Sequence, residues 1–472
     1  MAHGPLMIGW SRGEITPKGK TLLQGQFYTR IADGTVSPLT ATALAIEVTG
    51  REGETDHAIF LSCDLCNDGF KTELMRKLEG RCPGLDADKV TVNATHTHTG
   101  PCLRVGGYEE PRGDPDYISP DEYREWLAVR LAEIVETAWN TRQPGQICRG
   151  FSYAVVGRSR RAVYSDGTAQ MYGRTDREDF LGFESCDDHA VNMLFTRDGD
   201  GELTGMLVNL ACTAQCDESL SMYSADFWHD VRQAVEERYG PLVQILPQCA
   251  PSGDMSPHLL ADQKEERELR NRLGVDDKGI IARRIMTAIN EGIETASANQ
   301  GSVDLVHEVK SFSLPRIMVT TGQYERERMI RPMSDEERKK QPFEFQRVWG
   351  FGLVSDPVAR YEQQEENPLH EVESHIIRLG DAVFATNPFE LFVEYGTRIR
   401  CRSRALQTFL VELADGSANG AYLPTQRALN GGHYSAVIKS NWVGPEGGKV
   451  LVDETVRAID RLFEGEDYPR TR

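Results

Sequence analysis

The sequence NATHTHTGP spans residues 93–101 and directly follows the β-branched run Val90-Thr91-Val92. This alternation predicts a strand that ends near His96, and Gly100-Pro101 predicts a turn after it. Residues i and i+2 of a strand point to the same face, so His96 and His98 are expected side by side at the strand end. Two neighbouring imidazoles can bind a metal ion or transfer protons near neutral pH. A short H-x-H pattern is also common in polar loops, and by itself it favours ordinary hydrogen-bonded histidines.

Composition is typical of a globular protein. The 472 residues are 39% hydrophobic, enough for one large core or two modest ones. A formal net charge of −19 argues against binding to nucleic acid or an anionic membrane, because both need a basic surface. The sequence contains no run of about 18 apolar residues, so no membrane span is predicted. The ten cysteines without a recognisable leader sequence predict free thiols and a cytoplasmic location.

Short apolar runs with strand character alternate irregularly with helical segments. Strands are expected at residues 42–48, 58–62, 90–94, 191–195, 206–211, 242–246, 374–379, 383–386 and 408–413. Helices are expected after the capping box at residues 119–122, from Ser224 to Gly240, across 280–293 and at 454–463. Without a regular βαβ rhythm, this order predicts an α+β fold of mixed β-sheets packed together and flanked by helices. The charged segment 322–345 is expected to be a solvated helical insertion.

Three further motifs carry chemical groups. SGDMSPH at residues 252–258 predicts a tight loop that exposes the Ser256 hydroxyl, which is of interest where a base or metal lies beside it. Glu390 follows the apolar strand of residues 383–386, and a carboxylate there needs a metal or an arginine as partner. Tyr422 and Tyr434 lie in a stretch rich in glycine and amide side chains, where buried tyrosines ordinarily pack and donate one hydrogen bond.

Taken in order, HTHTGP, GDMSP, a strand followed by PFE, NGAYLPT and a later tyrosine resemble the neutral/alkaline ceramidase family. The resemblance runs from about Gly9 to about Tyr434. Further similar segments lie in the intervals: Ser62-Cys63-Asp64, Ser159-Arg160-Arg161 with Asp166-Gly167-Thr168, and Ser224-Ala225-Asp226.

The resemblance implies a zinc site with His96, Glu390 and Tyr422 as ligands. It also implies that Ser256 is a nucleophile or activates a water, and that His98, Arg160 and Tyr434 surround the substrate amide. Zinc would polarise the carbonyl, and arginine and tyrosine donors would stabilise the oxyanion. The expected function is therefore metal-dependent hydrolysis of an amide bond in a small soluble substrate.

Two features depart from the family. Thr213 stands where the family has a further histidine ligand. Cys212, Cys216, Asp226 or His229 are candidate replacements, but we expect none and hence an open zinc site. The chain also ends after one last helix, so residues 1–472 are expected to form a single ceramidase-like catalytic domain without a C-terminal β-sandwich domain.

Two other functions remain open at this point. One is a metalloenzyme of the same fold that acts on a sugar or polyol derivative, and the other is a non-catalytic relative used for binding or assembly. The retention of the motif residues argues against the second. Ceramide itself is not the expected substrate, because the sequence shows neither a leader sequence nor an apolar rim. A homo-oligomer is compatible with these features.

Overall fold

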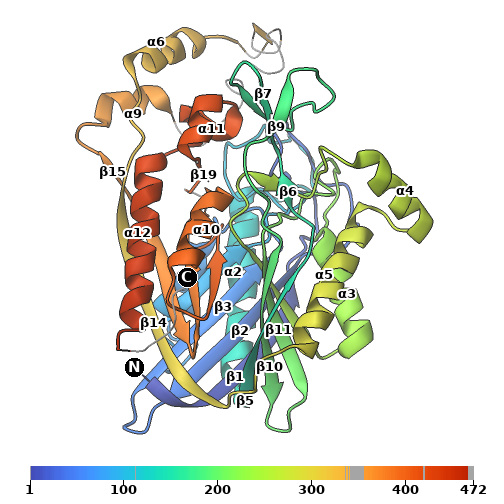
Figure 1. Cartoon of the computed structure of the whole chain (residues 1–472), viewed down its shortest axis with the longest axis vertical. Coiled ribbons are helices and arrows are strands. Elements are labelled where there is room, and N and C mark those ends of the chain that lie inside the picture. Colours follow the sequence, from blue (N-terminus) through green and yellow to red (C-terminus); the bar gives the residue numbers. More distant parts are fainter. Residues whose placement is uncertain are drawn as a thin grey trace.

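One folded β-sheet with helices on its outer faces forms most of the protein (Figure 1). The computed structural model describes residues 2–111, 113–334, 336–337, 340, 356–417 and 420–465. Within these residues the main sheet has twelve strands, and β1 (Ala2–Glu14) belongs to both of its halves. Residues Ala2 to Pro5 pair with β14, whereas Leu6 to Glu14 pair with β2. The long first strand therefore joins the two halves.

The first half of the sheet has a pair of parallel strands at each of its two edges. It contains β4 (Val90–Ala94), β3 (Thr55–Cys63), β2 (Thr40–Thr49), β1, β5 (Gln143–Tyr153), β10 (Ala190–Asp198), β11 (Leu203–Leu210) and β12 (Gln244–Cys249). The second half continues from β1 through β14 (Ser302–Pro315), β15 (Leu369–Leu379), β16 (Ala382–Thr386) and β18 (Gln407–Val411).

The two halves pack face to face through an apolar layer. Leu44, Phe60, Leu194, Leu207 and Leu246 of the first half share one buried cluster with Leu305, Ile377, Phe384 and Phe409 of the second. The rings of Phe60 and Phe384 lie 4.8 Å apart, and those of Phe384 and Phe409 lie 4.3 Å apart. Such aromatic pairs add to the hydrophobic stabilisation of the layer.

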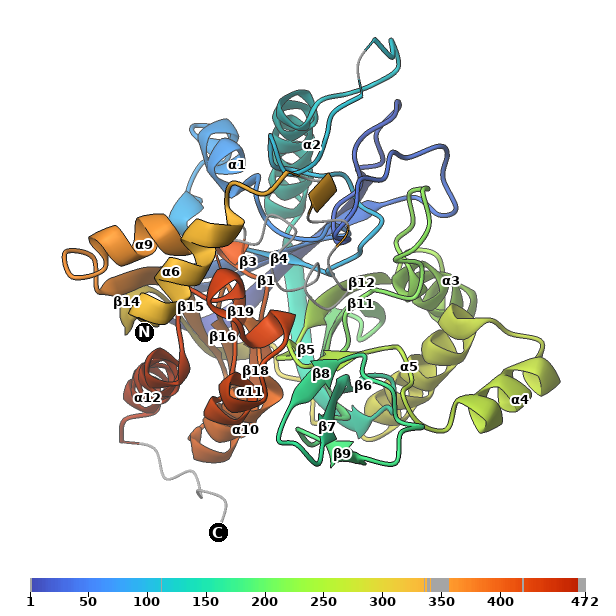
Figure 2. The same ribbon diagram turned by 90° about the horizontal axis from the view of Figure 1, so that it is seen from above.

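Three groups of helices cover the outer faces, as Figure 2 shows from above. Helices α1 (Lys71–Leu78) and α2 (Pro120–Asn140) cover β2 to β4, and α3 (Phe227–Tyr239) and α5 (Asp277–Glu294) cover β10 to β12. Helices α10 (Val393–Arg402) and α12 (Pro445–Leu462) cover the second half. None of the helices in the described part of the chain has the length and apolarity of a membrane-crossing segment.

Smaller elements complete the fold. The remaining helices in the described residues are α4 (Gln263–Leu273), α6 (Thr321–Ile330), α9 (Pro357–Gln363) and α11 (Gln426–Gly431), with short 3₁₀ turns at Ala87–Lys89, Tyr434–Ala436 and Ile438–Ser440. The remaining strands are β6 (Arg158–Ser159), β7 (Arg161–Tyr164), β8 (Ala169–Met171), β9 (Phe180–Phe183), β13 (Met255–Ser256), β17 (Glu390–Leu391) and β19 (Tyr422–Leu423).

The predicted α+β class is confirmed, and the expected strands are present with small shifts. The capping box at Ser119 opens α2, whereas the last helix begins at Pro445, well before residue 454. Strands β1, β5 and β14 were not predicted. Glycines 4, 9 and 13 and Pro5 weaken the strand pattern of β1. Helix α6 covers the start of the charged segment 322–345, and residues 335, 338–339 and 341–345 of that segment lie outside the described residues.

The carboxyl ends of three parallel strand pairs meet at one end of the folded sheet. The pairs are β3–β4, β11–β12 and β16–β18. The segment after β18 links the two halves there, because the Glu412 N–H donates to Cys249 O and the Ala94 N–H donates to Leu413 O. Such ends are where loops converge in sheets with parallel strands, and the sequence motifs follow β4, β12 and β16.

A substitution at Gly9 tests how closely α2 packs on the sheet. A Cβ at this position would lie 2.0 Å from the Ala138 carbonyl oxygen of α2. We expect Gly9→Ala to lower the free energy of unfolding by about 2 kcal/mol, because the helix must shift to admit the methyl group. Denaturant titration measures the change. Gly199→Ala is the matched control, since no heavy atom lies within 4 Å of its Cβ position. Equal midpoints for the two variants would contradict this packing.

Candidate active site

His96 and Glu390 meet at the end of the folded sheet, one from each half. The His96 Nδ1–H donates to the Cys66 carbonyl oxygen at 2.8 Å. This bond uses Nδ1, so Nε2 is the ring nitrogen that can bind another group. His96 Nε2 lies 3.6 Å from Glu390 Oε2. The imidazole thus directs its second nitrogen at a carboxylate oxygen.

The two histidines are neighbours for a different reason from the one predicted. Strand β4 ends at Ala94, and His96 has a left-handed φ of 61°, so the alternation of a strand does not extend to His98. The His96 and His98 rings are nevertheless 4.8 Å apart in an edge-to-face arrangement. A turn therefore brings them together, and a residue other than glycine in this backbone region is often found at a functional site.

Glu390 and Tyr422 are adjacent because β17 and β19 form a short parallel ladder. The two residues are direct partners in its register, and the Glu390 N–H donates to Ala421 O at 2.9 Å. Burial, followed by the Glu390 carboxylate, raises the pKa of Tyr422. The Oε2 atom of Glu390 is buried without a hydrogen-bond partner among the described residues. This orphaned oxygen is the one that faces His96.

Arg160 connects this pair to the loop that carries Ser256. Its guanidinium donates to the Gly253 carbonyl at 2.8 Å and to the Tyr172 hydroxyl at 2.9 Å. The Nη2 atom is also 3.7 Å from Glu390 Oε2. Burial acts to lower the pKa of Arg160, but the surrounding phenols and Glu390 raise it overall. A buried positive charge therefore lies between the carboxylate and the serine loop.

The SGDMSPH loop is fixed against the strand end that carries Glu390. A Cβ on Gly253 would lie 2.2 Å from the Glu390 carbonyl oxygen, so glycine is needed at this close approach. The Asp254 carboxylate accepts the Val393 N–H at 2.8 Å, at the first residue of α10. The Ser256 Oγ accepts hydrogen bonds from the Tyr172 hydroxyl and from the His258 N–H, both at 3.2 Å.

Tyr434 lies beside Tyr422. Its ring is 6.2 Å from the Tyr422 ring and 5.3 Å from the Phe27 ring. The structure thus brings His96, Glu390 and Tyr422 into one cluster with Arg160 and Tyr434 around it. Ser256 joins the cluster through Tyr172 and Arg160.

His98 belongs to a separate chain of hydrogen bonds that begins at Thr213. The Thr213 hydroxyl donates to Gln215 Oε1, and Gln215 Nε2 lies 2.8 Å from His98 Nε2. His98 Nδ1 lies 3.1 Å from Glu218 Oε2. Burial chiefly lowers the pKa of His98 to about 4, so the ring is neutral at pH 7. Both ring nitrogens already have side-chain partners, which leaves no lone pair directed at a metal.

Glu218 continues this chain to His258. Its Oε1 atom lies 3.1 Å from His258 Nε2. Although burial acts to raise it, hydrogen bonds from His258 and His98 lower the pKa of Glu218. Thr213, at the position where the resemblance implied a further histidine, thus belongs to a polar network with Gln215 and His98.

Cys66 is the residue near His96 that the motifs did not indicate. Within the described part of the chain, the metal-ligating side chains grouped with His96 are Cys66 and His98. The candidate replacements Cys212, Cys216, Asp226 and His229 are not in that group. Asp226 instead caps α3, where its carboxylate accepts the Phe227 N–H.

A second cluster, Glu373, His375 and Asp415, also has the donors of a metal site. The ammonium of Lys71 already lies between the two carboxylates, 2.5 Å from Glu373 and 2.7 Å from Asp415. A lysine therefore already occupies the space between the two carboxylates.

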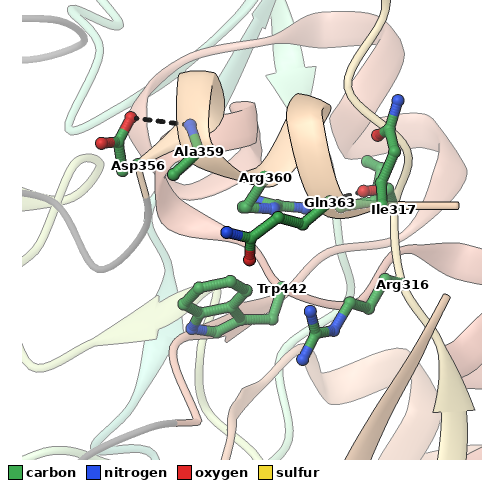
Figure 3. Close-up of a pocket in the computed structure, with 8 residues that line it drawn as sticks. Arg316, Ile317, Asp356, Ala359, Arg360, Gln363 and Trp442 are labelled. Atoms are coloured by element: carbon green, nitrogen blue, oxygen red, sulfur yellow. Dashed lines mark hydrogen bonds between the residues drawn. The ribbon is translucent and has the colours of Figure 1, made fainter. Parts of the chain in front are cut away.

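The main chain behind Tyr422 is held by Arg360 of α9. Figure 3 shows Arg360 beside Trp442 in the wall of a small pocket. The Arg360 guanidinium donates to the carbonyls of Ile317, Ile438 and Asn441. The Asn441 side chain donates in turn to the Tyr422 carbonyl at 3.1 Å. Helix α9 thus fixes the strand that presents the phenol.

Glu412 lies behind the site and makes the stability of the fold depend on pH. Its carboxyl accepts the Ser252 hydroxyl at 2.5 Å and the Leu391 N–H at 2.7 Å. Burial raises the pKa of Glu412 from 4.5 to about 8. Its protonated form is therefore favoured in the folded state, so its contribution to stability is complete below pH 4.5 and is lost as the pH rises to about 8.

We expect Glu412→Gln to flatten this pH dependence, because a neutral amide donates to Ser252 and accepts from Leu391 at any pH. Urea unfolding between about pH 5 and pH 8 measures the slope. The exposed Glu178→Gln is the control and should keep the wild-type slope. A Glu412→Gln slope equal to that of the wild type would show that this carboxyl does not titrate in the window.

Comparisons with known proteins identify the fold. No family profile matches the sequence, and a search of curated proteins finds no match. A solved ceramidase complexed with C2 is similar, with a TM-score of 0.67 and 17% identity, over 99% of this chain and 77% of that chain. The neutral ceramidase from Pseudomonas aeruginosa gives a TM-score of 0.66 and 17% identity, over 97% of this chain and 75% of that chain. The resemblance expected from the motifs is confirmed at the level of the fold, which is that of the neutral ceramidases.

Proposed function

We propose that the protein is a zinc-dependent hydrolase that cleaves the amide bond of a small N-acyl substrate. The observation that carries the proposal is the 3.6 Å separation between His96 Nε2 and Glu390 Oε2. Two ligands of one tetrahedral zinc ion lie about 3.3 Å apart, given metal–ligand bonds of about 2 Å. The pair therefore has the spacing that a shared ion requires.

The donor set fits zinc. His96 offers the ring nitrogen that its hydrogen bond to Cys66 leaves available, Glu390 offers a buried oxygen without a hydrogen-bond partner among the described residues, and Tyr422 is the direct ladder partner of Glu390. These three residues would hold the ion and leave a fourth position for substrate, as in catalytic rather than structural zinc sites. When bound, zinc supplies a Lewis acid that polarises the substrate carbonyl.

The remaining residues account for acyl transfer. Ser256 Oγ attacks the carbonyl carbon, the C–N bond breaks, and the hydroxyl proton ends on the leaving amine. Water then cleaves the acyl ester, which releases a carboxylic acid and restores the serine. Arg160 and Tyr434 are donors for the negative charge on the carbonyl oxygen, a contribution that is commonly the largest in such reactions.

The polar network beside the site favours a hydrophilic substrate over ceramide. Gln215, Glu218 and His258 offer amide, carboxylate and imidazole groups in a chain that passes His98 and reaches the Ser256 loop. The partly exposed carboxylate of Glu218 can accept further hydrogen bonds, and hydroxyl groups of a substrate are suited to donate them. An N-acylated amino sugar combines the amide with these hydroxyls and also covers the alternative of a sugar derivative.

Zinc content and turnover of two variants test the proposal. We expect the protein to purify with stoichiometric zinc and His96→Ala to lose both the metal and amide hydrolysis. Ser256→Ala should keep its zinc and lose about 10³-fold or more in kcat on a panel of N-acyl compounds, as expected for a lost nucleophile. The exposed His3→Ala and Ser221→Ala are matched controls with wild-type behaviour.

Each outcome has a separate meaning. His96→Ala with undiminished zinc and activity would refute the proposed ligand set. Near-wild-type turnover of Ser256→Ala would refute the serine nucleophile and leave hydrolysis to an activated water.

A further inference from the structure

We propose that Tyr172 is a catalytic residue whose phenol stabilises the negative charge that develops on Ser256 Oγ. The inference deepens the proposed function and rests on it, because Ser256 is the nucleophile there. Tyr172 belongs to none of the sequence motifs and follows directly after β8.

Arg160 sets the direction of the Tyr172 hydroxyl. The Arg160 Nη1–H donates to the phenol oxygen at 2.9 Å. A guanidinium has only donors, so the phenol proton must point elsewhere. The acceptor it meets is Ser256 Oγ, at 3.2 Å. The positive charge behind the phenol also strengthens it as a donor, because hydrogen bonds in a chain polarise one another.

Ser256 Oγ has a second fixed donor. The main-chain N–H of His258 reaches it at 3.2 Å, and the serine is fully buried, so the exposed hydroxyl predicted from the loop sequence is not observed. In the described part of the chain, no imidazole or carboxylate is hydrogen-bonded to this oxygen, in contrast to serine nucleophiles paired with a histidine base. Two donors aimed at one oxygen stabilise its anionic form before the reaction begins.

The backbone of Tyr172 is held in an unusual conformation to make this contact. Its φ is 55°, in the left-handed region that residues with a side chain rarely adopt. Its N–H donates to the Arg160 carbonyl at 2.6 Å, so Arg160 holds both the main chain and the phenol. The next residue must be glycine, since a Cβ on Gly173 would lie 2.3 Å from the Tyr164 hydroxyl. Strain of this kind persists where the surroundings fix it, and it is typical of functional sites.

The rate of labelling by an alkyl fluorophosphonate tests the role without knowledge of the natural substrate. The probe forms a P–O bond with Ser256 Oγ, and fluoride leaves with the hydroxyl proton. We expect Tyr172→Phe to label about 10²-fold more slowly than the wild type, with unchanged zinc content, because one donor to the reacting oxygen is lost.

Tyr153→Phe is the matched control. It removes the same atom from an exposed side chain at the end of β5, away from Ser256, and it should label at the wild-type rate. Ser256→Ala should show no labelling. A Tyr172→Phe rate within about twofold of the wild type would overturn the inference while leaving the nucleophile in place. A wild-type protein that does not label would instead overturn the serine nucleophile of the proposed function, and the inference with it.

A second variant provides the test if Tyr172→Phe does not fold. Replacement of Tyr172 by 3-fluorotyrosine keeps the shape and the Arg160 contact, but this phenol loses its proton at a lower pH than tyrosine. Its labelling rate should match the wild type at neutral pH and, as the pH is raised, fall at a lower pH than the wild-type rate does, because the more acidic phenol loses its donor proton first. A pH profile that coincides with that of the wild type would contradict the role of the phenol as donor.

Discussion

The contacts of the buried Arg160 guanidinium hold the candidate active site together. A buried charge is costly unless hydrogen bonds and opposite charge compensate for it. Here the compensation comes from the Gly253 carbonyl, the Tyr172 hydroxyl and the Glu390 carboxylate. These partners belong to three segments far apart in the sequence. The hydrogen bonds and the ion pair of Arg160 therefore fix the Ser256 loop, the Glu390 carboxylate and the Tyr172 phenol relative to one another.

The folded sheet brings these segments to the same place. His96, Ser256 and Glu390 each follow a strand of a parallel pair, and the segment after β18 ties the strand ends together. Leu413 and Asp415 in that segment have left-handed φ values of 55° and 53°, and Lys71 neutralises Asp415 from α1. The scaffold concentrates irregular backbone at this end, as expected where loops carry function and the sheet carries stability.

The sequence contains the local features of the fold and only part of the site. The capping box of α2 and the strand before His96 were predictable because neighbouring residues encode them. Strand β1 was not, because its glycines serve close packing against α2 rather than strand propensity. His96 and His98 are neighbours because His96 has a left-handed φ and forms a turn, which the alternation of side chains along a strand does not predict. Arg160 and the metal-binding role of Tyr422 were indicated by resemblance alone, whereas Glu390 was also indicated by its place after an apolar strand, and the structure places the three together.

Tyr172 and Gln215 were missed for a physical reason. Each acts through a long-range hydrogen bond, to Ser256 and to His98 respectively, and no local pattern encodes such a contact. Anomalous diffraction at the zinc edge from crystals of the purified protein is the direct test of the proposed zinc site. A zinc peak is expected at about 2.0–2.2 Å from His96 Nε2 and a Glu390 carboxylate oxygen, with the Tyr422 hydroxyl as third ligand. A zinc-free site with Glu390 hydrogen-bonded to His96, or a peak at the Glu373 cluster alone, would contradict it.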